Sequence, residues 1–181
     1  MLLRKFNAAV GLLTTFFLLT HAISISVWML SQGNIAYPNR IISWILVGLM
    51  AIHVFISVDL VISGHMETEK RKCKHYPKMN ISMIVQRLSG ILLVIFTGLH
   101  VAGASGSMHT PQVVHAIVPP LFFTIAMAHV AVSTGKAFIT LGIGNAKLVR
   151  KVDIVMKVLC ILTLIAAVTG FYSYSFMGAG K

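Results

Sequence analysis

The sequence predicts an all-α integral membrane protein with five transmembrane helices, and three observations support this fold class. Hydrophobic residues make up 57% of the 181 positions and charged residues only 10%, whereas soluble domains carry about 25% charged residues. The mean hydropathy is +0.88. The apolar residues gather into five stretches, each long enough for the roughly 20-residue helix that crosses a bilayer. This composition excludes a soluble enzyme.

The five predicted spans cover about residues 8–30, 41–63, 82–104, 113–135 and 154–176. The first span follows Arg4 and Lys5, as the apolar part of a secretory signal does, but its apolar run is too long for a typical signal and we expect it to be retained. The connections are predicted at 31–40, 64–81, 105–112 and 136–153, and none is large enough for a soluble domain. The chain is therefore predicted to be a single transmembrane domain, 1–181.

Basic residues predict the orientation, because Lys and Arg in short loops stay on the cytoplasmic side. Arg40 and Lys181 fall on one side of the predicted spans. The other side carries Arg4, Lys5, Lys70, Arg71, Lys72, Lys74, Lys78, Arg87, Lys136, Lys147, Arg150, Lys151 and Lys157. We expect the N-terminus inside and the C-terminus outside the cytoplasmic membrane of a prokaryote, with no nucleic acid as partner. The cluster at 70–78 either contacts anionic lipid headgroups or docks a soluble partner.

An internal repeat relates the first two spans to the next two. Residues 7–21 (NAAVGLLTTFFLLTH) align with residues 86–100 (QRLSGILLVIFTGLH), and residues 53–57 (HVFIS) align with residues 129–133 (HVAVS). The repeating unit is a helical hairpin. Because both copies enter the membrane from the same side, they are expected to be related by an axis along the membrane normal.

The repeat places one histidine within each of the first four spans: His21, His53, His100 and His129. Ionisable residues at this depth are costly and indicate function. Any one of them could be a neutral imidazole bonded to a neighbouring helix, but four in symmetrical positions need a common explanation. With a rise of ~1.5 Å per residue, His21 and His100 lie roughly 20 Å from the cytoplasmic ends of their helices, and the other two lie roughly 10–15 Å from theirs.

Two levels of paired histidines, each pair from diagonal helices of a four-helix bundle, suit two six-coordinate irons. Bis-His haem b is the natural group for this ligand set, with His21 and His100 on the upper iron and His53 and His129 on the lower. The chain has no CxxCH motif, so the haem would be held noncovalently. Zinc would need four donors converging at one point, which two separate levels do not provide.

Small and hydroxyl-bearing residues accompany the histidines. Glycines would let a flat macrocycle or a neighbouring helix approach closely, and they occur at Gly11, Gly90, Gly98 and Gly103. Ser57 and Ser133 each follow a histidine by one helical turn, and Thr14 precedes His21 by two turns. Each hydroxyl either supports an imidazole or, as is more common, bonds the carbonyl of the preceding turn.

Across nearly its whole length the chain resembles the five-helix, di-haem cytochrome b subunits of succinate dehydrogenases and fumarate reductases, the succinate:quinone oxidoreductase family. The segment Gln86–Gly90 (QRLSG) is similar to the HRxSG signature of that family, with Gln86 in place of the usual His. The resemblance implies that His21 and His100 bind the distal haem, and that His53 and His129 bind the proximal haem.

The same resemblance implies partners that the sequence pattern alone does not reveal. The chain would anchor an FAD-containing flavoprotein and an iron-sulfur subunit on the cytoplasmic face. Electrons would pass between the iron-sulfur clusters and membrane quinone, either menaquinone or ubiquinone, and the dicarboxylate would not touch this chain. A dimer of such a complex is compatible with the resemblance, as is contact with membrane lipid.

Two ends of the predicted bundle carry candidate residues for the quinone site. At the cytoplasmic end these are Arg87, Ser89 and Asp59, although Arg87 could instead pair a haem propionate or a lipid phosphate, and Asp59 could pair Arg87 or Lys136. At the outer end they are Asn34, Arg40, His109, Gln112 and His115. The outer end is favoured, because a second haem is of use only when electrons must cross the membrane.

Two other functions remain open at this stage. One is a di-haem cytochrome b of another quinone-linked oxidoreductase, of the cytochrome b561 type or the hydrogenase and formate dehydrogenase type. The other is a small transporter or scaffold without haem, in which the histidines relay protons or bond between helices.

Overall fold

The computed structural model describes residues 2–70, 81–104 and 112–177, with the side chains of 64–70, 104, 112–116 and 177 left aside. Its helices are α1 (Leu2–Leu30), α2 (Arg40–Lys70), α3 (Ile81–Ala104), α4 (Gln112–Leu141) and α5 (Ala146–Met177), and the described residues form no strand. Each helix is long and apolar enough to cross a membrane. The prediction of an all-α, multi-pass membrane protein with five spans is confirmed.

The helices extend beyond the apolar stretches that predicted them. Helix α4 continues to Leu141 and α5 begins at Ala146, so the predicted long connection at 136–153 was wrong and only residues 142–145 join the two helices. Backbone hydrogen bonding continues a helix through polar residues as readily as through apolar ones, so the end of an apolar run does not mark the end of a helix.

Capping residues set the helix ends instead. Gly142 has a φ of 73°, and hydrogen bonds from Gly142 N to Ile139 O (3.1 Å) and from Ile143 N to Phe138 O (3.1 Å) close α4 in a Schellman motif. Asn145 then caps α5 by accepting a hydrogen bond from Leu148 N at 2.9 Å.

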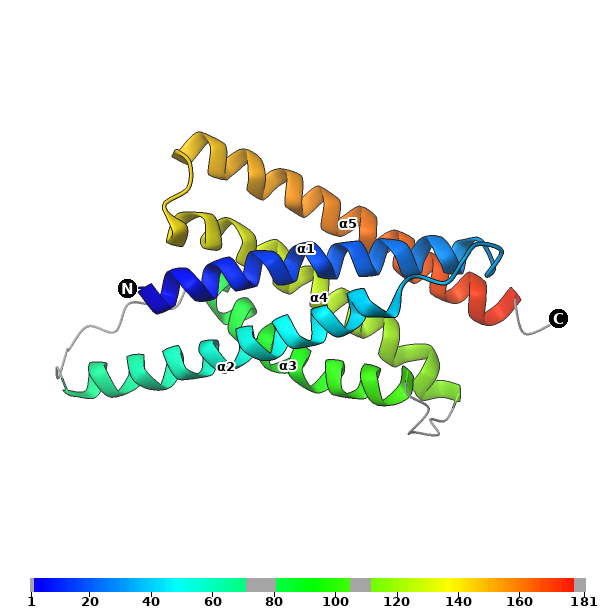
Figure 1. The fold of residues 1–181 in the computed structure, drawn as a ribbon, viewed down its shortest axis with the longest axis horizontal. Coiled ribbons are helices and arrows are strands. Elements are labelled where there is room, and N and C mark those ends of the chain that lie inside the picture. The colour runs from blue at the N-terminus through cyan, green and yellow to red at the C-terminus, as the bar shows by residue number, and fades with distance from the viewer. Residues whose placement is uncertain (1, 71–80, 105–111, 178–181) are drawn as a thin grey trace.

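The connection between α1 and α2 uses the same devices. Gln32, with a φ of 54°, takes the left-handed position after α1, and Gly33 N donates to Trp28 O at 3.1 Å. Asn39 caps α2, since its Oδ1 accepts a hydrogen bond from Ile41 N at 2.9 Å. These short, capped connections make neighbouring helices antiparallel, as Figure 1 shows.

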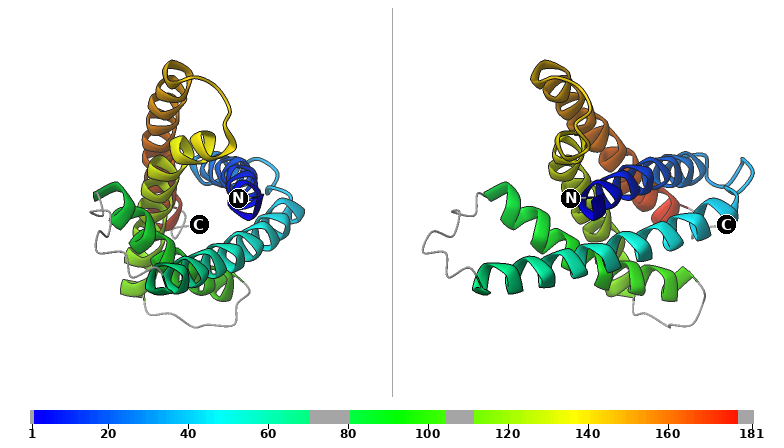
Figure 2. Two further views of the ribbon diagram at one scale, coloured as in Figure 1. Left: turned by 90° about the vertical axis from the view of Figure 1, so that its left-hand side faces the viewer. Right: turned by 60° about the vertical axis from the view of Figure 1, so that its left-hand side comes forward.

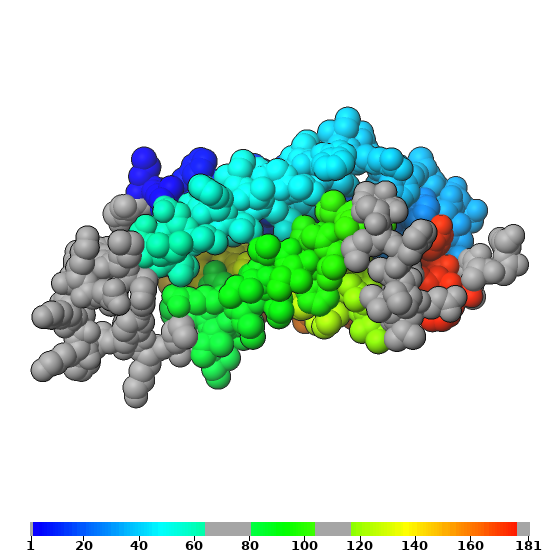
Figure 3. Space-filling view, turned by 90° about the horizontal axis from the view of Figure 1, so that it is seen from below, coloured from blue at the N-terminus to red at the C-terminus, as the bar shows by residue number. Residues whose placement is uncertain are grey.

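The helices form two hairpins, α1–α2 and α3–α4, which meet through α1 and α4, and α5 packs against both of these helices (Figures 1 and 2). Among the described residues no comparable packing joins α2 to α3 or α2 to α4. Figure 3 shows α2 and α3 running over one face of the molecule. Among the described residues α2 and α3 are therefore not closely packed on one another, whereas α5 packs on α1 and α4.

The tightest packing lies where α1, α3, α4 and α5 meet. The core cluster there consists of Leu19, Leu93, Phe122, Ala126, Met127, Val130 and Cys160, and Cys160 is a free, buried thiol. Gly170 allows α5 to approach α1 closely, because a Cβ at this position would lie 3.1 Å from Ser26 O. Near the same end, Trp28 packs against Tyr37 and Tyr174, with ring centroids 5.0 and 4.8 Å apart.

We predict that Gly170→Leu destabilises the fold by about 1–3 kcal/mol, because the added side chain must push α5 away from the Ser26 carbonyl. Thermal unfolding in detergent measures the effect. Gly48→Leu is the matched control, since Gly48 lies on an exposed face of α2 and a Cβ there meets nothing within 4 Å. Equal stability of the two variants would contradict the packing assigned to Gly170.

Candidate functional site

The lower two histidines make the same contact in each hairpin. His53 of α2 lies against Gly11 of α1, where a Cβ would be 2.9 Å from the His53 Cε1. His129 of α4 lies against Gly90 of α3, where a Cβ would be 3.4 Å from the His129 Cε1. Because both members of each contact align in the sequence repeat, the two hairpins place their lower imidazoles in equivalent positions.

Equivalent backbone groups lie beside these two rings, and among the described residues a hydroxyl group lies within hydrogen-bond distance of His129 alone. The backbone of Asn7 lies beside His53, and the backbone of Gln86, the aligned residue, lies beside His129. Ser89 also brings its Oγ to 2.9 Å from Nδ1 of His129. Such a contact fixes the ring orientation and leaves the other ring nitrogen, Nε2, for a ligand.

The upper two histidines have different neighbours. Nδ1 of His21 lies 3.3 Å from Ser43 Oγ of α2. His100 stacks on the buried ring of Phe122 of α4, with centroids 5.2 Å apart and planes inclined by 29°. Each upper histidine is thus held by its own hairpin, through a hydroxyl group in the first hairpin and an aromatic face in the second.

The structure places His21 within electrostatic range of His100, and His53 within electrostatic range of His129. His21 lies ten positions after Gly11 along α1, and His100 lies ten positions after Gly90 along α3, which corresponds to ~15 Å between the two levels. Among the described residues no three His, Cys, Asp or Glu side chains gather at one point.

Three buried polar atoms near these pairs have no hydrogen-bond partner among the described residues: Nδ1 of His53, Oγ1 of Thr97 and Oγ of Ser133. Thr97 lies three residues before His100, and Ser133 lies four residues after His129, on the same helix faces. Native proteins rarely leave buried polar atoms unpaired. Thr97 is next to the upper pair, and Nδ1 of His53 and Oγ of Ser133 are at the lower pair, so each level has a polar atom that could bond a bound group.

The donor set, two imidazoles at each of two levels, is one that would hold two haem groups. The glycines at the lower level leave the imidazoles free of a neighbouring Cβ.

Of the flanking hydroxyls, only Thr14 takes one of the two roles that the sequence left open. Thr14 Oγ1 donates to Val10 O of the preceding turn at 2.8 Å, as expected for the commoner role. Ser57 does not follow that pattern, because it exchanges hydrogen bonds with the side chain of Asn7 across the first hairpin, at 3.1 and 3.4 Å. A hydroxyl can prefer a neighbouring helix when a polar side chain there lies within reach.

Lys136 links α4 to α3 by hydrogen bonds, a role that the sequence did not indicate. Its Nζ donates to Gln86 Oε1 at 2.7 Å and to Ser82 O at 3.1 Å, both on α3. The suggested pairing of Lys136 with Asp59 is therefore not formed, and Asp59 instead accepts a hydrogen bond from Ser63 on its own helix at 3.4 Å. The lysine also places a positive charge near His129.

The candidate quinone residues do not form one cluster. Ser89 is buried against His129, while Arg87 is exposed on α3 and Asp59 is exposed on α2, a helix that does not pack closely on α3. At the other end, Arg40 is the exposed first residue of α2. Asn34 is exposed in the α1–α2 connection, and the side chains of His109, Gln112 and His115 lie outside the described residues.

Comparison of the chain with models of protein families, with curated proteins and with solved structures found no match.

We predict that Lys136→Met lowers the free energy of unfolding by about 1 kcal/mol, because it removes two charge-assisted hydrogen bonds that are only partly shielded from solvent. Thermal unfolding of the purified protein measures the loss. Lys147→Met is the control, since Lys147 is exposed on α5 and makes no hydrogen bond or ion pair with the described residues. A variant as stable as this control would disprove the bridging role of Lys136.

Proposed function

We propose that the chain is a di-haem cytochrome b, the membrane anchor of a succinate dehydrogenase or fumarate reductase complex. One observation carries the haem assignment: the aligned contacts of His53 with Gly11 and of His129 with Gly90, which place two imidazoles in equivalent positions of the repeat. Plain helix packing would not require a histidine opposite a glycine in both hairpins. The unpaired buried atoms beside the histidines support the same assignment.

The chain's own residues hold and orient the proposed groups. His21 and His100 are the ligands of one haem iron, and His53 and His129 are the ligands of the other. Ser43 and Ser89 hold the Nδ1 side of His21 and His129, which favours one ring orientation and makes Nε2 the coordinating atom. When bound, the two haems would supply a one-electron path between the clusters of a partner subunit and membrane quinone.

The distribution of charge supports a docking face at one end. The N-terminal end of α1, the C-terminal end of α4 and the first turns of α5 lie at the same end of the molecule (Figure 1). The described basic residues there include Arg4, Lys5, Lys136, Lys147, Arg150 and Lys151. By the positive-inside rule this end faces the cytoplasm, where a flavoprotein and an iron-sulfur subunit would bind.

The restriction to the succinate:quinone oxidoreductase family is supported by the QRLSG segment at the start of α3. In this chain that segment supplies three groups of the lower site: Gln86 to Lys136, Ser89 to His129, and Gly90 as the surface against which His129 lies. Three of the five residues of this segment therefore lie at the lower level of the proposed site.

We predict that the purified protein contains about two noncovalent haem b groups per chain, measured by extraction and by the reduced-minus-oxidised spectrum. His53→Ala and His129→Ala should each remove one haem, and His21→Ala and His100→Ala should each remove the other, because each pair serves one iron. A colourless native preparation, or retention of both haems in His53→Ala, would contradict the assignment.

Glycine variants test the same site without removing a ligand. Gly11→Leu should cost the same haem as His53→Ala, since the new side chain would occupy the position of the His53 ring. Gly48→Leu, on the exposed face of α2, should keep both haems. Equal loss in the two glycine variants would assign the effect to general destabilisation.

Copurification distinguishes the proposed complex from the alternatives. We predict that the chain, isolated from its native membrane in mild detergent, brings down an FAD-containing subunit and an iron-sulfur subunit. Two haems with neither partner would favour a cytochrome b561. Two haems with a hydrogenase or a formate dehydrogenase subunit would favour that family, and no haem at all would favour a transporter or scaffold.

A further inference from the structure

A groove between α4 and α5 lies at the basic end of the molecule, and none of the four paired histidines lines it. The two helices diverge toward their connection at 142–145 (Figures 1 and 2). The space between them has a volume of about 760 Å³, which is within the roughly 300–1,000 Å³ of sites that take small ligands.

Three of the residues that line the groove are glycines. The Asp153 carboxylate of α5 lies against Gly135 of α4, where a Cβ would be only 2.9 Å from Asp153 Oδ1. Gly142 and Gly144, which also line the groove, have φ values of 73° and 82° that favour glycine in the turn. A Cβ at Gly142 would meet nothing within 4 Å, so the backbone is open at this position.

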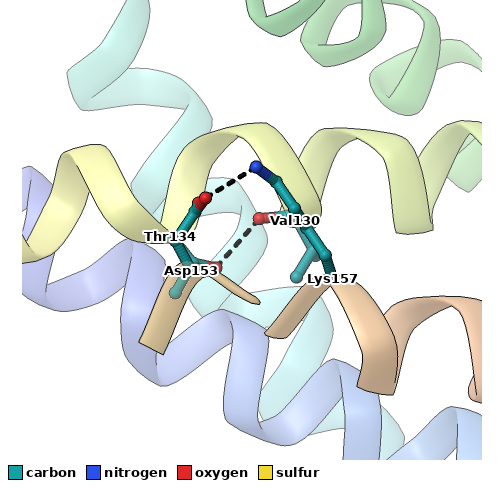
Figure 4. Close-up of polar contacts among 4 residues, drawn as sticks. All are labelled: Val130, Thr134, Asp153 and Lys157. Carbon is teal, nitrogen blue, oxygen red and sulfur yellow. Dashed lines mark hydrogen bonds and ion pairs between the residues drawn. The ribbon is translucent and has the colours of Figure 1, made fainter. Parts of the chain in front are cut away.

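The groove carries an excess of positive charge. Three cations line it, Lys136, Arg150 and Lys157, against the single acid Asp153. Asp153 is already paired with Lys157, whose Nζ lies 2.6 Å from its Oδ2, as Figure 4 shows. Arg150 makes no hydrogen bond or ion pair with the described residues. The groove is thus complementary to an anion, with the Arg150 guanidinium available as a donor.

The walls next to these charges are apolar and belong to a candidate membrane span. Val132, Phe138 and Ile139 of α4 line the groove and belong to the candidate span Ile117–Leu141, and Ile139 is 68% exposed. A free inorganic anion would gain nothing from such walls. A ligand with an anionic head and a hydrocarbon tail would satisfy both parts of the groove.

We propose that this groove binds one anionic phospholipid, with its phosphate at Arg150 and Lys136 and an acyl chain along Val132 and Ile139. Basic pockets between transmembrane helices are suited to acidic headgroups, and the charge excess here selects an acidic lipid over a zwitterionic one. A soluble protein partner is disfavoured, because the apolar wall continues into the span of α4.

Native mass spectrometry of the purified full chain tests the proposal by titration with dioleoylphosphatidylglycerol, dioleoylphosphatidylcholine or inorganic phosphate. We predict that the first binds more tightly than the second, and that Arg150→Gln weakens its binding about fivefold. Lys147→Gln, which removes a charge from α5 outside the groove, should leave binding unchanged. Arg150 has no described partner within the protein, so its replacement should leave thermal unfolding unaltered.

Equal affinity for the two lipids, or an equal loss in Arg150→Gln and Lys147→Gln, would overturn the proposal. Displacement of the acidic lipid by inorganic phosphate at similar concentration would assign the groove to a free anion instead. The measurement detects bound lipid and not haem, so failure of the lipid proposal can be told apart from failure of the proposed electron-transfer function.

Discussion

The contact between an imidazole and a bare glycine backbone is the constraint on which the rest of this structure depends. In each hairpin a histidine of the second helix lies against a glycine of the first, and at Gly11 a Cβ would be only 2.9 Å from the His53 Cε1. These contacts set how closely the two helices of a hairpin approach at the lower level. The upper level has other contacts within the same hairpins, His21 beside Ser43 and His100 on Phe122.

The second constraint is the cost of polar groups inside a membrane. A polar side chain that loses water needs a hydrogen-bond partner on its own helix or on a neighbouring one. The two hairpins supply partners on the neighbouring helix in different ways. In the first hairpin Asn7 pairs with Ser57, and in the second Gln86 pairs with Lys136. Asn7 and Gln86 occupy aligned positions, so the repeat conserves a bridge between the helices while the partner changes.

Much of the candidate site followed from the sequence, because spacing along a helix translates directly into depth. The repeat of 7–21 in 86–100 and the HV dipeptides were enough to pair His21 with His100 and His53 with His129. The sequence did not reveal that Ser89 would face His129 or that Lys136 would reach α3, since both contacts depend on the rotation of one helix about its axis relative to another. It also misjudged the α4–α5 connection, because the apolar pattern ends before the caps at Gly142 and Asn145.

Composition and hydrophobic patterning by themselves determined that this is a five-span, all-helical membrane protein, since no other arrangement satisfies the backbone of such apolar stretches in lipid. The repeat and the helical rise also predicted which histidines share a level. Only the tertiary structure decided that α2 and α3 are not closely packed on one another among the described residues, that α5 packs on α1 and α4, and that a charged groove forms where α4 and α5 diverge. These features depend on crossing angles and close approaches such as Gly170 on Ser26, which arise from side-chain packing between distant segments.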